Sequence, residues 1–155
     1  TDLIAEWLGG REYQEHTAWD LYGGVGLFVP VLAHAVQGKV ISVDYSPAAT
    51  AGEQPGLADC DVEVKSAKVE HVAAQLPKPG AVVLDPPRTG AGEDVIRSVA
   101  AAAPQAVVHV GCDPATFARD LGYWNRHGYG IEKMALINAF PGTHHFETIA
   151  LITPA

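Results

Sequence analysis

Two spacings of apolar residues alternate along the chain, one typical of helices and one typical of buried strands. Apolar residues repeat at helical spacing in residues 3–8, 27–37, 69–75, 93–102 and 116–127. Short apolar runs predict strands at residues 17–22, 39–44, 61–65, 81–85, 105–111, 131–139 and 146–153. Residues 47–51 are compatible with a short helix, and residues 52–60, with two glycines and a proline, indicate a loop.

Strands that alternate with helices are typical of βαβ units and of a mainly parallel sheet. The last two strands have no helix between them, which predicts an antiparallel edge. We therefore expect an α/β domain over residues 1–155, with helices on both faces of a mostly parallel, seven-stranded sheet. Ligands of such sheets bind beyond the carboxyl ends of the strands, so polar residues at those ends are the candidate site.

Composition and charge narrow the class of protein. The 155 residues are 48% hydrophobic, and no apolar run approaches the roughly 20 residues of a membrane-spanning helix. Ten Lys and Arg against 18 Asp and Glu give a net charge of −8, which counts against nucleic-acid binding by this domain alone. Two cysteines form neither a disulfide framework nor a metal cluster, so we expect a cytoplasmic protein.

A glycine-rich turn follows the first predicted strand. Gly23, Gly24 and Gly26 would let the backbone approach a ligand closely, at the point where a helix begins. Asp44 ends the next strand and could accept hydrogen bonds from ribose hydroxyls. These features fit an adenosine-type cofactor, although a tight turn followed by an acid without any ligand is the alternative. A dinucleotide-binding turn needs a third glycine where Val29 stands, which disfavours NAD.

Two successive prolines follow the fourth predicted strand, in Asp85-Pro86-Pro87-Arg88. They impose an extended chain and hold Asp85 at the strand tip. A structural turn needs at most one proline, so this segment is predicted to belong to a site.

Cys112 follows the fifth predicted strand and precedes a turn. A thiol beside a helix N-terminus can ionise and act as a nucleophile, but its position is equally compatible with an inert thiol. We interpret Cys60 as a small core residue.

Glu147 begins an otherwise apolar strand. A carboxylate there could serve as a general base, whereas the alternative is a solvated acid on an edge strand. His144 and His145 are adjacent and point to opposite sides of an extended chain, so they do not predict a metal site.

Four ordered motifs resemble the catalytic domain of the S-adenosylmethionine-dependent RNA (uracil-5-)-methyltransferase family, which makes 5-methyluridine in tRNA and ribosomal RNA. They extend from Asp20 to about Ile152 and read DLYxGxGxF, DPPRxG, GCDPxTxxRDL and FPxTxHxE. The resemblance implies a Rossmann-like class I methyltransferase fold, S-adenosylmethionine as the cofactor and a uridine in tRNA or rRNA as the substrate.

The resemblance also implies a role for the residues of each motif. Cys112 would be the nucleophile that adds to C6 of uracil, and Glu147 the base that removes the C5 proton. Contacts to the cofactor or the target base would come from Tyr22, Gly23, Gly24, Gly26, Leu27, Asp44 and Asp85. Pro86, Arg88 and His145 would position the substrate, and no metal would be required. The target base would leave its stack to enter the site.

Some features depart from the family pattern. Leu27 stands where some members carry an amide, and Asn138 replaces a frequent acid. Members also carry upstream RNA-binding segments that precede the position of Thr1, so we expect one catalytic domain from a protein of on the order of 400 residues, which binds RNA through its other parts. The alternatives are another class I methyltransferase, acting on an exocyclic amine, and a non-catalytic cofactor-binding fragment.

Overall fold

The computed structural model describes residues 2–45, 59–138, 142 and 146–155. The helices are α1 (Asp2–Leu8), α2 (Val29–Val36), α3 (Val69–Val72), the 3-10 turn η3 (Ala73–Gln75), α4 (Glu93–Ala101) and α5 (Pro114–Arg126). The strands are β1 (Thr17–Leu21), β2 (Lys39–Asp44), β3 (Val62–Ser66), β4 (Ala81–Leu84), β5 (Ala106–Gly111), β6 (Tyr129–Asn138) and β7 (Phe146–Pro154). All seven predicted strands are present. The helix predicted at residues 47–51 lies outside the described residues.

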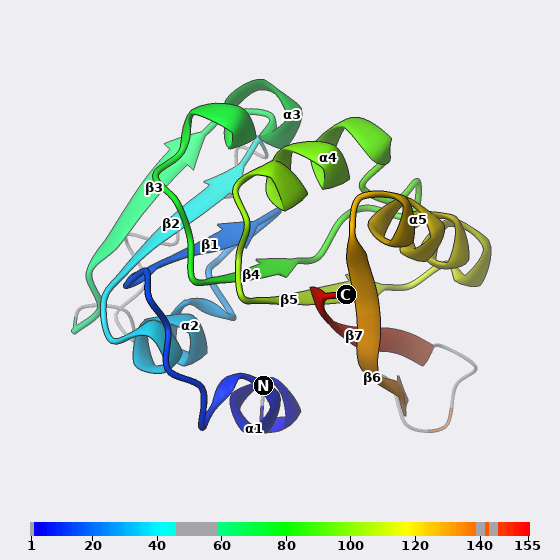
Figure 1. Ribbon diagram of the computed structural model, residues 1–155, viewed down its shortest axis with the longest axis horizontal. Coiled ribbons are helices and arrows are strands. Elements are labelled where there is room, and N and C mark those ends of the chain that lie inside the picture. The colour runs from blue at the N-terminus through cyan, green and yellow to red at the C-terminus, as the bar shows by residue number, and fades with distance from the viewer. Residues whose placement is uncertain (1, 46–58, 139–141, 143–145) are drawn as a thin grey trace.

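The strands form one sheet in the order β3-β2-β1-β4-β5-β7-β6. The first five strands pair in parallel. β7 pairs antiparallel with both β5 and β6, so it lies between them although it is the last strand in the chain (Figure 1). The predicted mostly parallel sheet with an antiparallel edge is confirmed.

Helices cover both faces of the sheet, as predicted. In Figure 1, α1 and α2 lie below the sheet, and α3, α4 and α5 lie above it. Each face has its own buried cluster, with Leu8 and Leu32 on the first side and Ile96 and Trp124 on the second. β1, β4 and β5 contribute alternate residues to the two clusters, which explains why they read as continuous apolar runs.

α5 begins two residues before its predicted start. Pro114 occupies its first turn, where a missing N–H costs nothing. The Asp113 carboxylate caps the helix by accepting hydrogen bonds from the amides of Ala115, at 2.9 Å, and Thr116, at 3.2 Å. The first turn of α5 is therefore fixed immediately after Cys112.

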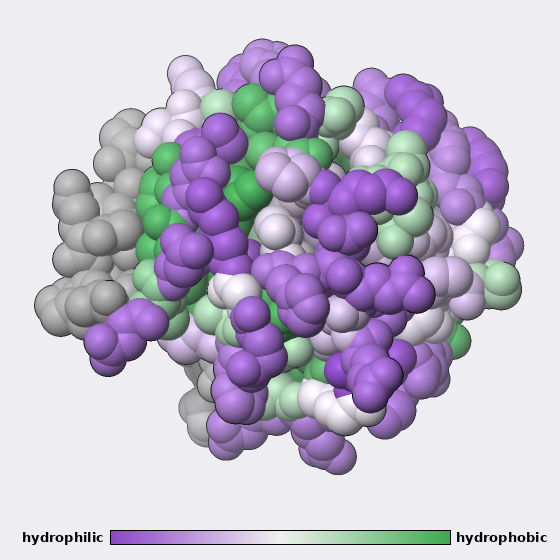
Figure 2. Space-filling view, turned by 60° about the vertical axis from the view of Figure 1, so that its left-hand side comes forward, coloured by the Kyte–Doolittle hydropathy of each residue, from purple (hydrophilic) through white to green (hydrophobic). Residues whose placement is uncertain are grey.

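Polar side chains dominate the face that carries β3, and Figure 2 shows apolar residues on it only in strips between them. Among the described residues, no helix combines the length and the apolar character that crossing a membrane would require.

Candidate functional site

The predicted site residues follow the carboxyl ends of four parallel strands. β1 leads into Tyr22, β2 ends at Asp44, β4 leads into Asp85 and β5 leads into Cys112. These ends lie at one edge of the sheet, because the strands are neighbours in register. The sheet thus gathers residues that lie up to 90 positions apart in the sequence.

β7 brings Glu147 to the same edge. Gly111 of β5 pairs antiparallel with Thr148, so the next residues toward this edge are Cys112 on one strand and Glu147 on the other. Glu147 also acts electrostatically on Asp85, which follows β4, the strand on the other side of β5. Cys112 directly follows β5 and Glu147 is near the start of β7, so the residues predicted as nucleophile and base lie at the adjoining ends of two adjacent strands, which in a sheet run about 5 Å apart.

The glycine turn after β1 is closed by internal hydrogen bonds. The Gly23 amide donates to the carbonyl of Val43 at 3.1 Å, and the Gly26 amide donates to the carbonyl of Gly23 at 2.9 Å. The Gly24 amide donates to Oδ2 of Asp44 at 2.7 Å. The turn is thereby tied to the end of β2, and its three glycine amides are already engaged by the protein.

Gly23 has no room for a side chain. A Cβ there would collide with Oδ2 of Asp20 and Oγ of Ser42. Gly24 and Gly26 have φ angles of +55° and +86°, in the region that favours glycine. The sequence thus places glycine where the turn requires it.

Asp20 is a buried carboxyl at this turn, and its role was not predicted from the sequence. It is 1% exposed, and Ser42 Oγ donates to its Oδ2 at 3.2 Å. Oδ1 has no hydrogen-bond partner among the described residues. Burial, followed by the charges of Asp85 and Asp44, raises the pKa of Asp20 to about 7. An unsatisfied buried acceptor beside a glycine turn is typical of a ligand site.

The pKa of Asp20 gives a testable dependence of stability on pH. Because the folded protein holds this proton up to about pH 7 and the unfolded chain releases it near pH 3.8, stability is lost as pH rises through that window. Asp20→Asn cannot titrate. Relative to wild type, the free energy of unfolding of the variant should rise between pH 5 and pH 8 by on the order of 2–3 kcal/mol.

Urea unfolding of both proteins without ligand at the two pH values measures this difference. Asp61→Asn, at an exposed position, is the control for a general effect of removing a carboxylate. If the free energies of unfolding of Asp20→Asn and wild type differ by the same amount at both pH values, the carboxyl of Asp20 does not resist ionisation in the folded protein.

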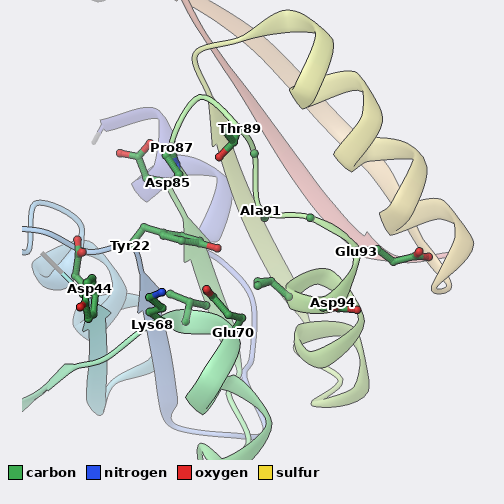
Figure 3. Close-up of a pocket in the computed structure, with 15 residues that line it drawn as sticks. Tyr22, Asp44, Lys68, Glu70, Asp85, Pro87, Thr89, Ala91, Glu93 and Asp94 are labelled. Carbon is green, nitrogen blue, oxygen red and sulfur yellow. The ribbon is translucent and has the colours of Figure 1, made fainter.

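A cavity of about 900 Å³ opens between the strand ends and the starts of α3 and α4 (Figure 3). Three predicted cofactor residues line it: Tyr22, Asp44 and Asp85. The rest of its lining is Tyr45, Lys68, Val69, Glu70, Pro87, Thr89, Gly90, Ala91, Gly92, Glu93, Asp94 and Val95. Figure 3 shows the Tyr22 ring extending between Lys68 and Glu70 on one side and the loop from Pro87 to Ala91 on the other.

Charge in this cavity is mostly negative. Burial raises the pKa of the Tyr22 hydroxyl, and the nearby carboxylates of Glu70, Asp120 and Asp44 raise it further. Burial and the charge of Glu147 raise the pKa of Asp85 to about 6. Lys68 contributes a positive charge, with its Nζ 5.3 Å from the centre of the Tyr45 ring. The cavity therefore favours a ligand that carries positive charge.

Tyr45, Lys68 and Glu70 were not predicted as site residues. They lack a motif, and only the parallel pairing of β2 with β3 brings the chain after β3 next to Asp44. They could have been expected only from the general rule that ligands bind beyond the carboxyl ends of parallel strands.

The other predicted residues are not part of the cavity lining. Pro86 is buried, Arg88 and Cys112 are exposed, and Glu147 is half-buried. Leu27, predicted to contact the cofactor, is 63% exposed. His145 lies outside the described residues. Cys60 is partly buried and packs against the core, as interpreted from the sequence. The described residues contain no group of three or more His, Cys, Asp or Glu that could hold a metal ion.

The sequence of this chain is similar to a family model and to several named proteins. A family model described as tRNA (uracil-5-)-methyltransferase matches residues 68–154. A protein named an uncharacterized RNA methyltransferase in Corynebacterium glutamicum is 51% identical over 97% of this chain and 38% of its own length. One of the same description in Corynebacterium efficiens is 55% identical over 97% of this chain and 37% of its own length. The chain thus spans well under half the length of these relatives.

Solved structures agree with the fold. The tRNA (uracil-54, C5)-methyltransferase of Pyrococcus abyssi, in complex with S-adenosyl-L-homocysteine, superposes with a TM-score of 0.79 at 28% identity, over 98% of this chain and 37% of its own. Precorrin-6y C5,15-methyltransferase of Geobacter metallireducens shares the fold at 15% identity, with a TM-score of 0.78 over 99% of this chain and 87% of its own. The expected Rossmann-like class I methyltransferase fold is confirmed. Because the family model matches more than half of its residues, the chain belongs to the tRNA (uracil-5-)-methyltransferase family.

Proposed function

We propose that this chain is the catalytic domain of a longer S-adenosylmethionine-dependent RNA methyltransferase, which methylates C5 of a uridine through a covalent adduct with Cys112. The observation that carries the proposal is the meeting of Cys112, Glu147 and Asp85 at one edge of the sheet, beside the cavity. One thiol and one carboxylate at the adjoining ends of adjacent strands are the two groups that this chemistry needs.

The cavity fits the proposed cofactor better than it fits a dinucleotide. S-adenosylmethionine carries a sulfonium and an ammonium group, and the lining contains five carboxylates against one lysine. The unsatisfied Oδ1 of Asp20 offers a further acceptor at the glycine turn. A dinucleotide would bring a pyrophosphate, which needs free amides at the turn. The amides of Gly23, Gly24 and Gly26 already donate within the protein.

In this proposal Asp44 holds the ribose hydroxyls, and Tyr22 packs against the bound ligand. When bound, S-adenosylmethionine supplies an electrophilic methyl group. C5 of uracil is too weak a nucleophile to take up that group unaided, so the protein must first activate the ring.

Cys112 performs the activation as a thiolate. Its sulfur forms a bond to C6, and the electrons of the C5=C6 double bond move toward O4, which makes C5 nucleophilic. Cys112 is exposed, so a base that has left its stack can reach it.

Glu147 completes the reaction after C5 has formed a bond to the methyl carbon and the methyl–sulfur bond has broken, which leaves the former sulfonium as a neutral thioether. Its carboxylate removes the C5 proton, the C5=C6 double bond forms again, and the Cys112 sulfur leaves as a thiolate. The proton then passes from Glu147 to water, which restores both side chains. Asp85, between the cavity and Glu147, contacts the target base.

RNA made with 5-fluorouridine tests the proposal. Fluorine replaces the proton that Glu147 removes, so the reaction stops while Cys112 is still bound to C6. The full-length protein, incubated with S-adenosylmethionine and 5-fluorouridine-substituted tRNA or rRNA, is expected to form a complex that survives denaturing electrophoresis. Peptide mass spectrometry should locate the nucleotide on Cys112. Methylation of ordinary RNA without any such complex would contradict the covalent mechanism. If the methyl group is then found on an exocyclic amine, the protein is a methyltransferase of that other kind.

A further inference from the structure

Three side chains on one face of α5 hold the loop that leads from the two prolines to α4. Thr116, Arg119 and Asp120 lie three and four positions apart, so they share a helix face. All of their partners in this loop are backbone atoms of residues 88–92. We call the three side chains the α5 clamp and their partner segment the 88–92 loop.

Two members of the α5 clamp hold carbonyl groups at the start of the loop. Thr116 Oγ1 donates to the carbonyl of Arg88 at 2.8 Å. Arg119 Nη2 donates to the carbonyl of Thr89 at 2.7 Å. The side chain of Arg88 is not needed for this contact, which explains how its position can be fixed while it remains exposed.

The Asp120 carboxylate holds the end of the loop by accepting hydrogen bonds from two backbone amides of the loop. The Ala91 amide donates to Oδ2 at 2.7 Å, and the Gly92 amide donates to Oδ1 at 3.3 Å. Asp120 is 0% exposed, so its carboxylate depends on these partners and on Arg119, whose Nη2 lies 3.1 Å from Oδ1. A buried carboxylate with two backbone donors is a strong and directional anchor.

A buried histidine stands behind Asp120. The indole N–H of Trp124 donates to Nδ1 of His109 at 2.9 Å, so the ring hydrogen is on Nε2, which lies 3.5 Å from Oδ2 of Asp120. Burial lowers the pKa of His109, which keeps the ring neutral. Asp120 is thus supported from the sheet by β5, the strand that leads to Cys112.

The loop lies so close to the α5 clamp that only glycine fits at its centre. A Cβ on Gly90 would lie 2.6 Å from Arg119 Nη2 and 2.7 Å from Asp120 Oδ2. Gly90 and Gly92 also have φ angles of +81° and +84°. The close approach of the 88–92 loop to α5 therefore depends on glycine in the loop as well as on the side chains of the α5 clamp.

The 88–92 loop is at the same time a wall of the cavity, through Thr89, Gly90, Ala91 and Gly92. The helix that holds it starts two residues after Cys112. We propose that the α5 clamp, with Asp120 as its main positioning residue, holds the 88–92 loop in place as a wall of the cofactor cavity. The clamp thereby fixes the position of this wall relative to Cys112. This inference rests on the proposed function for the identity of the cavity's ligand.

Calorimetry of S-adenosylmethionine binding to the full-length protein tests the proposal. In Asp120→Asn one acceptor oxygen becomes an NH₂ group, which cannot receive a hydrogen bond from an amide. The dissociation constant is expected to rise about 10-fold or more. Thr116→Val removes the bond to Arg88, together with a longer one of 3.4 Å to the carbonyl of Asp113 within the first turn of α5, and should raise the dissociation constant by about 3-fold.

Tyr129→Phe is the matched control for lost stability. Tyr129 is buried in the core on the same face of the sheet and donates to the carbonyl of Pro104 at 2.7 Å, away from the loop. Its loss should lower the melting temperature and leave the dissociation constant within about 2-fold of wild type.

Hydrogen exchange gives a readout that does not depend on the ligand. In Asp120→Asn the amides of Ala91 and Gly92 should exchange at least about 10-fold faster, while amides inside α4 are unchanged. If Asp120→Asn does not fold, Thr116→Val gives a comparison at the start of the loop, where the Gly90 amide, which donates to the carbonyl of Pro87 at 2.8 Å, should exchange faster. Faster exchange with unchanged affinity would overturn the proposal, as would unchanged exchange. Absence of binding by the wild-type protein would contradict the proposed function instead, and exchange would still test the clamp.

Discussion

Replacing Cys112 by alanine is expected to lower methyl transfer to RNA by at least about 10³-fold, because the substitution removes the group that activates C5 of uracil. The variant should fold normally, since Cys112 is exposed and lies outside the helices and strands. Covalent capture of 5-fluorouridine-substituted RNA should disappear with the activity. Transfer of a labelled methyl group and denaturing electrophoresis measure the two effects in the full-length protein.

Cys60 provides the matched control for this substitution. It is the other cysteine of the chain, is half-buried and packs against the core on the side of α1 and α2. Cys60→Ala should leave both methyl transfer and covalent capture close to wild type, with a small loss of stability. Full methyl transfer by Cys112→Ala would exclude a covalent mechanism and favour an acceptor, such as an exocyclic amine, that needs no activation.

Glu147→Gln should separate the two halves of the reaction. The amide cannot accept the C5 proton, so turnover should fall by about 10²–10⁴-fold, the usual contribution of a general base. The thiol of Cys112 remains able to add to C6. Ordinary RNA, without fluorine, should therefore accumulate as a covalent complex with this variant, in contrast to Cys112→Ala. Quantifying the complex on denaturing gels during a single turnover gives the measurement.

Glu132→Gln is the corresponding control on the neighbouring strand β6. Glu132 is exposed and pairs with Arg11 at 3.0 Å, an interaction that contributes little at a surface. The control variant should turn over normally and accumulate no complex. If Glu147→Gln retains wild-type turnover, the C5 proton must leave through another group, and Asp85, whose pKa the charge of Glu147 raises, is the next candidate.

The site concentrates carboxyl groups, and this changes the meaning of the net charge of −8. Asp20, Asp44, Asp85 and Glu147 all lie at one edge of the sheet, on or directly after β1, β2, β4 and β7. Negative charge in this place suits a cationic cofactor but repels phosphates. Under the proposed function, the phosphate contacts to RNA come from other parts of the longer protein.

Local patterns in the sequence determined most of the elements and their bounds. Apolar spacing located all seven strands, most clearly the central ones, because strands buried on both faces must be largely apolar. The site was indicated by the glycines at positions 23, 24 and 26 and by the two prolines after β4. A glycine-rich turn or two successive prolines at the end of a strand is typical of a ligand site. The motif residues Asp85, Cys112 and Glu147 were also visible in the sequence.

Long-range pairing was decided only by the tertiary structure. The last two strands predicted an antiparallel edge, but nothing local showed that β7 would lie inside β6, next to β5. That choice depends on burial, because β7 has apolar residues for both faces, whereas most of β6 is exposed. It is also the choice that sets Glu147 beside Cys112.

The sequence by itself thus indicated the motif residues of the candidate site and the edge of the sheet at which they would lie. The tertiary structure decided how they are held: the buried Asp20 with an unsatisfied oxygen, and the 88–92 loop fixed by α5. Motif residues can be recognised in the sequence because local backbone geometry and the proposed reaction each require particular residue types. Hydrogen bonds between residues about 30 positions apart, such as Arg119 to Thr89, arise only when packing brings the two segments together, so no local pattern predicts them.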